Sequence, residues 1–239
     1  MKSPKKNILI LGSAPDALDA RDWTVHPFDD IVAINNAWKI RDDWSYSIFP
    51  TDFPEVRRPN HSIGKRLISA EDYVVEQNKF GGFVYAGGTM AFTAAYWALA
   101  HFNPESLTFL GCDMIYDTEN THFYGKGTPD PLREDATLRN LEAKSARLEA
   151  FAFLLDCRLL NISKKEKSRL IFDRTSIDEL NLLTPVDKKK FNLKNIFKTI
   201  NLEKKLNYFV ADGKYWKHFD RFDINQIDHI DNLWLSCRV

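Results

Sequence analysis

A glycine-rich segment near the middle of the chain carries residue types that acid–base chemistry needs. It contains His122, Tyr124 and Lys126. A histidine titrates near neutral pH and can take a proton from a hydroxyl group. A lysine between two glycines can place its ammonium group on a phosphate. Asp113, at the end of a nearby apolar run, adds a carboxylate. A lone histidine is more often structural, so the prediction of a site at His122 depends on these polar neighbours.

Two glycine turns offer backbone N–H groups to an anion. One follows the apolar run 8–11 and consists of Gly12, Ser13, Ala14 and Pro15. The other precedes the apolar run 90–100 and consists of Gly87, Gly88 and Thr89. Glycine permits close approach of a ligand, and a helix N-terminus favours phosphate or carboxylate. Neither turn matches the dinucleotide or P-loop fingerprint. The alternative is a pair of tight turns, with Ser13 as a helix N-cap and Pro15 in the first turn.

Two asparagines end the apolar run 30–34. Side-chain amides both donate and accept hydrogen bonds, so Asn35 or Asn36 can read a base or a sugar. Ligands of open parallel sheets lie beyond the carboxyl ends of the strands, where these residues are expected. The alternative is a pair of turn asparagines with no ligand.

The apolar pattern predicts an α/β fold with a mostly parallel sheet and helices on both faces. A buried helix is predicted at 90–100, since this run is apolar nearly all round. A second helix, with one apolar stripe and charges between, is predicted at 134–155. Strands are predicted at 8–11, 30–34, 45–49, 83–86, 107–110 and 157–162, the last strand of the sheet.

The composition changes after residue 162. We therefore predict a domain at 1–162, with a lid segment at about 53–80 and a functional loop at 114–133, and a basic, aromatic helical region at 163–239. Basic and aromatic residues together are compatible with contact to the inner-membrane surface or to a second copy of the chain. The favoured prediction is a helical appendage that packs its aromatics on the sheet domain.

The overall charge and the cysteines exclude several classes of protein. The 239 residues include 33 Lys and Arg and 33 Asp and Glu, a balance that argues against a general nucleic-acid-binding protein. The three cysteines have no metal-ligand spacing, which favours a reducing cytoplasm. We see no secretory signal and no apolar run long enough to span a bilayer. A cytoplasmic protein, peripheral at the inner membrane if the C-terminal region binds lipid, is expected.

Five motifs in order resemble a known family. They are the Gly-Ser-Ala-Pro turn, Val-Ala-Ile-Asn-Asn-Ala-Trp at 32–38, Ala-Gly-Gly-Thr at 86–89, Phe-Leu-Gly-Cys-Asp-Met at 109–114 and Thr-His-Phe-Tyr-Gly at 121–125. Residues 7–162 thereby resemble the bacterial lipooligosaccharide sialyltransferases, which use CMP-activated nonulosonic acids on a Rossmann-like domain with a lid. The central block also resembles the related domain of motility accessory factors, shared with archaeal 6-hydroxymethylpterin pyrophosphokinases.

The resemblance implies roles for several residues. It places the nucleotide phosphates and ribose at the first glycine turn and the donor at the second. It places Asn36 against the CMP-sugar and Asp113 below the cytidine or sugar. The family's catalytic histidine falls on Lys126, and a family asparagine falls on Thr51. Tyr116 and Tyr124 are candidates for the tyrosines that flank the donor phosphate, and Arg133 lies just beyond the loop.

These observations predict a metal-independent, inverting glycosyltransferase. A CMP-activated acidic sugar, of nonulosonate or Kdo type, would be the donor substrate, with no further cofactor and a cell-surface glycan or glycolipid as acceptor. His122 would act as the base, and Lys126 or a nearby tyrosine would stabilise the departing phosphate. One alternative is a pyrophosphokinase-like enzyme with Mg²⁺ on Asp113 and Asp117. Another is a non-catalytic nucleotide-binding protein of a polysaccharide cluster.

Overall fold

A seven-stranded parallel sheet forms the centre of the computed structural model, which describes residues 5–60, 63–116, 120–127, 134–180 and 188–238. The strand order is β4-β3-β2-β1-β5-β6-β7, and every pairing is parallel. The strands are β1 Asn7–Leu11, β2 Asp30–Ile34, β3 Tyr46–Ile48, β4 Arg66–Ile68, β5 Ser106–Leu110, β6 Arg158–Asn161 and β7 Asp173–Arg174. This arrangement confirms the predicted α/β class.

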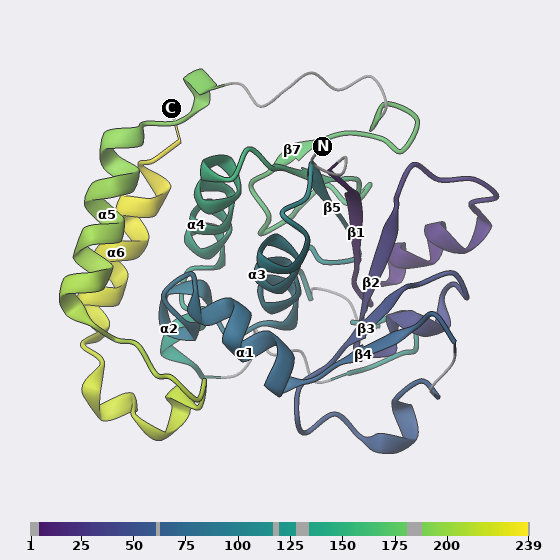
Figure 1. Cartoon of the computed structure of the whole chain (residues 1–239), viewed down its shortest axis with the longest axis horizontal. Coiled ribbons are helices and arrows are strands. Elements are labelled where there is room, and N and C mark those ends of the chain that lie inside the picture. The colour runs from purple at the N-terminus through teal and green to yellow at the C-terminus, as the bar shows by residue number, and fades with distance from the viewer. Residues whose placement is uncertain (1–4, 61–62, 117–119, 128–133, 181–187, 239) are drawn as a thin grey trace.

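The sheet lies between two unequal helical layers (Figure 1). On one face, the α-helices pack in an apolar cluster with the strands; on the other, two 3₁₀ helices cover a smaller cluster. The α-helices are α1 Ala70–Asn78, α2 Phe83–Ala86, α3 Met90–Phe102, α4 Leu141–Leu154, α5 Leu193–Leu206 and α6 Ile224–Leu235. The 3₁₀ helices are η1 Pro15–Asp22, η2 Asn35–Lys39, η3 Glu55–Arg57, η5 Ala136–Leu138, η7 Lys188–Lys190, η8 Tyr215–Lys217 and η9 Phe219–Arg221.

The strand order reverses between β1 and β5. β1 pairs with β2 on one side and with β5 on the other, and its residues from Ile8 to Leu11 are fully buried. Such all-apolar strands are typical of a parallel sheet that is covered on both faces. The reversal makes a crevice at the carboxyl ends of β1 and β5, where ligands of open α/β sheets bind.

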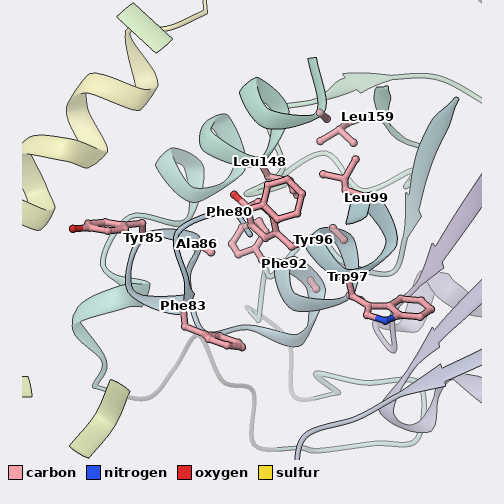
Figure 2. Packing of buried hydrophobic residues seen from close by; sticks show 14 of the residues in the cluster. Phe80, Phe83, Tyr85, Ala86, Phe92, Tyr96, Trp97, Leu99, Leu148 and Leu159 are labelled. Carbon is pink, nitrogen blue, oxygen red and sulfur yellow. The ribbon is translucent and has the colours of Figure 1, made fainter. Parts of the chain in front are cut away.

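The strand predicted at 83–86 is wrong, because these residues form the short helix α2. Gly82 and Gly87, at φ 84° and 86°, bound this helix in a conformation that favours glycine. Its side chains belong to the apolar cluster of the α-helical face; Phe83 and Tyr85 point away from α3 (Figure 2), and their rings stack on Tyr215 and Tyr208 of the C-terminal region. The strand that precedes this crossover is β4, which the sequence analysis missed because it is short and half exposed.

The helix predicted at 134–155 begins later and is not amphipathic. Asn140 caps α4 by accepting a hydrogen bond from the Ala143 amide, while η5 precedes it as a separate turn. Three of the charged residues predicted to face solvent are buried, namely Lys144, Arg147 and Glu149. The helices α5 and α6 cover the face on which these charges lie (Figure 1).

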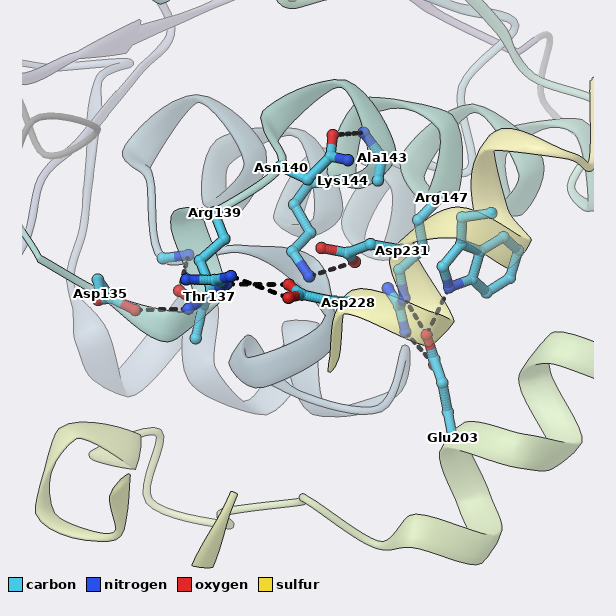
Figure 3. Close-up of polar contacts among 12 residues, drawn as sticks. Asp135, Thr137, Arg139, Asn140, Ala143, Lys144, Arg147, Glu203, Asp228 and Asp231 are labelled. Atoms are coloured by element: carbon cyan, nitrogen blue, oxygen red, sulfur yellow. Dashed lines mark hydrogen bonds and ion pairs between the residues drawn. The ribbon is translucent and has the colours of Figure 1, made fainter. Parts of the chain in front are cut away.

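The C-terminal region is joined to the sheet region by buried ion pairs. Lys144 of α4 contacts Asp231 of α6 at 2.6 Å, and Arg147 contacts Glu203 of α5 at 2.8 Å (Figure 3). The sheet also continues past residue 162, since β7 pairs with β6, so the strand at 158–161 is not the last one. No helix in the described part of the chain is long and apolar enough to cross a membrane.

Candidate functional site

A pocket of about 280 Å³ opens at the carboxyl ends of β1, β2 and β5. We call it the first pocket. It lies at the strand-order reversal, and it gathers residues from all five motifs together with Tyr116 and the segment after β3. The lining residues are Gly12, Ser13, Ile34, Asn35, Asn36, Pro50, Asp52, Phe53, Pro54, Arg57, Thr89, Met90, Ala91, Gly111, Cys112, Met114, Tyr116, His122, Tyr124 and Gly127.

The floor of the first pocket is formed by two loops in close contact. The Gly12 amide donates to the Leu110 carbonyl at 2.8 Å, and the Ala14 amide donates to the Gly111 carbonyl at 3.2 Å. A Cβ atom at Gly12 would lie 2.1 Å from the Gly111 carbonyl oxygen, so only glycine fits there. Both amides therefore hold the floor together, and the expected phosphate cradle at this turn loses two of its donors.

Ser13 lines the pocket, but it is not the N-cap of the following helix. The N-cap of η1 is Ala14, which has no side-chain hydrogen bond, and Pro15 occupies the first turn. Ala14 and Pro15 do not line the pocket. The Ser13 carbonyl accepts a hydrogen bond from the Phe123 amide at 2.9 Å, which attaches the loop 120–127 to the floor.

Two asparagines at the end of β2 carry unpaired oxygens. Asn36 is 3% exposed and Asn35 is partly buried, and both line the first pocket. Within the described part of the chain, neither side-chain oxygen has a hydrogen-bond partner. Leaving a buried polar atom unpaired costs about 1–3 kcal/mol, which a ligand with polar edges would recover. This feature is the strongest evidence that the pocket is built for a ligand.

The N-terminus of α3 forms another part of the wall. Thr89 caps this 13-residue helix by accepting from the Phe92 amide, and Met90 and Ala91 line the pocket beside it. The first turn contains no acidic residue, so its partial positive charge is available to an anion. Gly87 and Gly88 do not line this pocket, and the Gly88 amide donates to the Thr137 hydroxyl instead.

His122 lies at the rim in a structured hairpin. Its backbone exchanges two hydrogen bonds with Gly125, and its ring stacks on Tyr124 with centroids 4.9 Å apart. The Thr121 hydroxyl lies 2.8 Å from the His122 Nδ1 and also accepts from the Gly127 amide. If the same hydroxyl accepts from Nδ1–H, the lone pair of Nε2 remains for proton transfer. Burial lowers the pKa of His122 below its usual value, which favours the neutral base at pH 7.

Several predicted site residues lie elsewhere. Lys126 is exposed and does not line the first pocket. Asp113 is fully buried, accepts from the Asn161 amide at 2.9 Å, and also does not line it. Thr51 lines a neighbouring pocket, and Arg133 lies outside the described residues. Lys126, Asp113 and Thr51 were predicted from their positions in the chain and from the family resemblance, but they do not line the first pocket.

Arg57 is a site residue whose role the sequence analysis missed. Its segment was predicted only as part of a lid at about 53–80. In the structure it lines the first pocket, and its carbonyl accepts a hydrogen bond from the Trp38 indole at 2.9 Å. Arg57 thus adds an exposed cation to the lining of this pocket, a role that was expected of Lys126. The signal available in the sequence was the Arg57-Arg58 pair in the segment after β3.

No protein-family model, curated protein or solved structure matches the chain. In the described part of the chain, no three His, Cys, Asp or Glu side chains converge as metal ligands would. The first pocket is lined by two asparagines with unpaired side-chain oxygens, the N-terminus of α3, Arg57, His122 and the acidic Asp52.

Proposed function

We propose that the first pocket binds a CMP-activated acidic sugar and that the protein transfers this sugar to a glycan or glycolipid. The observation that carries the proposal is the pair of asparagines with unpaired oxygens in a pocket at the strand-order reversal. A cytosine and its ribose offer the amino and hydroxyl donors that these oxygens need. The family resemblance supports the choice of donor.

The phosphate of the donor would lie between α3 and η3. The helix N-terminus at Thr89 provides partial positive charge, and Arg57 can hold two phosphate oxygens with its planar guanidinium. Tyr116 and Tyr124 add aromatic rings with hydroxyl groups to the same wall. These groups would stabilise the charge that develops on the leaving phosphate.

His122 would act as the general base of the transfer. An acceptor hydroxyl attacks the anomeric carbon of the donor, the bond from this carbon to the phosphate breaks, and His122 Nε2 takes the hydroxyl proton. Attack from the face opposite the phosphate inverts the anomeric centre. CMP leaves with the bonding electron pair, and Arg57 and the helix N-terminus hold it.

The phosphoryl-transfer alternative has less support. It needs Asp113 as a magnesium ligand, but this side chain is buried under the pocket and hydrogen-bonded to Asn161. Its second ligand, Asp117, lies outside the described residues. We therefore prefer the glycosyltransferase. The identity of the nucleotide that binds distinguishes the two functions.

A thermal-shift screen of CMP, CDP, UDP, GDP and ATP, each with and without Mg²⁺, tests the proposal. A ligand at 100 times its Kd stabilises the folded protein by about 2.7 kcal/mol, so CMP is expected to raise the Tm by several degrees without Mg²⁺. Asn36→Ala should abolish this shift, and Asn225→Ala, an exposed asparagine of α6, should keep it. A shift that appears only with ATP and Mg²⁺ would favour the pyrophosphokinase, and a CMP shift without donor turnover would favour a non-catalytic protein.

A further inference from the structure

A second pocket of about 490 Å³ adjoins the first. The two share Pro50, Asp52 and Met90 as lining residues, so they form neighbouring compartments along one wall. The second pocket is lined by Pro50, Thr51, Asp52, Ala70, Tyr73, Val74, Phe83, Gly88, Met90, Thr93, Asp212, Gly213, Lys214, Tyr215 and Trp216.

One wall of the second pocket comes from the C-terminal region. Gly213, at φ 73°, makes a tight turn against Phe83 and Val74, where a Cβ atom would lie 3.0 and 3.1 Å from their side chains. Tyr215 is 2% exposed and stacks on Phe83 with centroids 6.2 Å apart. Its hydroxyl donates to Asp135 at 2.7 Å. The turn is thus attached to α1 and α2 and holds the next residue, Trp216, at the pocket.

Trp216 is much less buried than Tyr215. It is 55% exposed, while its neighbour Tyr215 is among the largest fully buried side chains. An exposed tryptophan beside a pocket offers a flat apolar face to a ligand. Polar residues line the same pocket: the carboxylate residues Asp52 and Asp212 and the hydroxyl residues Thr51 and Thr93.

This combination fits a sugar ring. A pyranose has an apolar face of C–H groups that packs on an aromatic ring, and an edge of hydroxyls that donate to carboxylates. Two carboxylates against the single ammonium of Lys214 disfavour an anionic ligand. A neutral hexopyranose satisfies both conditions, whereas a phosphate satisfies neither and an acidic sugar is disfavoured by its charge.

We propose that the second pocket is the acceptor subsite and that it binds a neutral hexopyranose on Trp216. The inference rests on the proposed function for its role in transfer, since an acceptor held here would direct a hydroxyl past Asp52 and Met90 into the first pocket. It also assigns the C-terminal region a function: the turn 210–216 completes a site whose other walls belong to the sheet region.

Saturation-transfer NMR with millimolar methyl β-galactopyranoside and methyl β-glucopyranoside tests the site directly. We expect a signal from at least one of them with the full chain, and at least a tenfold loss of that signal with Trp216→Ala. Trp216→Phe should retain it, because a phenyl ring keeps an apolar face. Phe197→Ala is the matched control: it removes a similarly exposed aromatic, 52%, that lines a different groove, and it should leave the signal unchanged.

The CMP thermal shift of the same variants is a separate readout of the first pocket. A sugar signal that depends on Trp216 without any CMP shift would support the subsite and contradict the proposed function. A CMP shift with no sugar signal would overturn the subsite alone. An equal loss with Trp216→Ala and Phe197→Ala, or no loss with Trp216→Ala, would also overturn it.

Discussion

At the scale of single residues, His122 combines a lowered pKa with a supported ring. Burial disfavours the imidazolium, and Thr121 and Tyr124 hold the ring in place. Both effects suit a base that is neutral before it takes a proton. Lys126, four residues later, is exposed and does not line the first pocket. The position of the family's histidine is therefore less informative here than the environment of His122.

His122→Ala should lower kcat/KM for transfer by about 10²–10⁴-fold, the usual contribution of a general base. The pKa is lowered from the ordinary value near 6.5, so the base stays neutral as pH falls to that value and protonates only below it. The wild-type pH profile should accordingly decline below pH 6.5. Full transfer by the variant would contradict the assignment, and His229→Ala, an exposed histidine of α6, serves as control.

Gly127→Ala should impair proton transfer by displacing the imidazole ring of His122. An added Cβ would lie 2.4 Å from the His122 Nδ1, so the imidazole has to move. We expect at least a tenfold loss of kcat/KM with a CMP thermal shift close to that of the wild type. The same change made in the His122→Ala background should cost nothing more, because there is no ring left to displace. Additive losses of kcat/KM in the double variant would show that Gly127→Ala does not act through the His122 ring.

At the scale of elements, α4 is the helix whose surroundings differ most from expectation. Its Arg147 donates to both oxygens of Glu203 and to the hydroxyl of Tyr96, and the indole of Trp234 donates to Glu203 as well (Figure 3). A charge that is buried this deeply is tolerated only because its hydrogen bonds are satisfied. These contacts fix α5 and α6 against α4.

Arg147→Met should destabilise the fold by about 3–5 kcal/mol, because Glu203 would stay buried without its cation. Adding Glu203→Gln should recover part of the loss by removing the unpaired charge. The free energy of unfolding in urea measures both effects. Arg139→Met is the matched control: its pair with Asp228 is 48% and 39% exposed, so water screens it and the cost should be much smaller than that of Arg147→Met. Equal costs for the two arginines would contradict the role of burial.

Glu149 on α4 should make stability fall as the pH rises. Burial raises its pKa to about 7, even though Arg238, 3.3 Å away, acts in the opposite direction. The folded protein keeps the proton between pH 4.5 and 7, where the unfolded chain loses it. The stabilisation is complete below pH 4.5 and is lost as the pH rises through 7, by on the order of 2–3 kcal/mol. In Glu149→Gln, the free energy of unfolding in urea should change less with pH over this range. An unchanged slope of this free energy against pH would refute the prediction.

At the scale of the whole molecule, the sheet region and the C-terminal helices share one core. The apolar cluster on the α-helical face includes Ile8 of β1 together with Ile196, Ile227 and Trp234 of α5 and α6. The lining of the second pocket also comes from both regions. The compositional change after residue 162 thus marks a change in sequence character within a continuous packing arrangement.

Deletion of residues 193–239 should abolish cooperative folding. The truncated chain would expose side chains of α4 that pack on α5 and α6, such as Phe151 beside Trp234, and would remove the carboxylates that pair with Lys144 and Arg147. Loss of a sigmoidal urea transition by circular dichroism is the expected result. A truncated chain that unfolds cooperatively with near-native stability would show that residues 1–192 form an independent domain.

The sequence alone determined the elements whose signals are local. The runs 8–11 and 31–34 indicate buried parallel strands because every side chain in them is apolar, and the helix at 90–100 follows from the same argument. The first pocket was predictable to the extent that parallel strands end at one edge, which brings Ser13, Asn36 and His122 together. The strands and the place of the pocket could both be predicted because the order of residues shows which segments are buried and where each strand ends.

Only the tertiary structure decided which polar groups face a ligand and which face a neighbouring helix. Arg57 and Lys126 are both cations in loops, yet one lines the pocket and the other does not. Lys144 and Arg147 have the spacing of a solvated surface and are buried because α5 and α6 cover them. Residues 83–86 are apolar enough for a strand. They form a helix because Gly82 and Gly87 bound it on both sides and a helix fits the space beside α3. The free energy of each of these side chains depends on groups far away in sequence, and a local pattern contains no information about them.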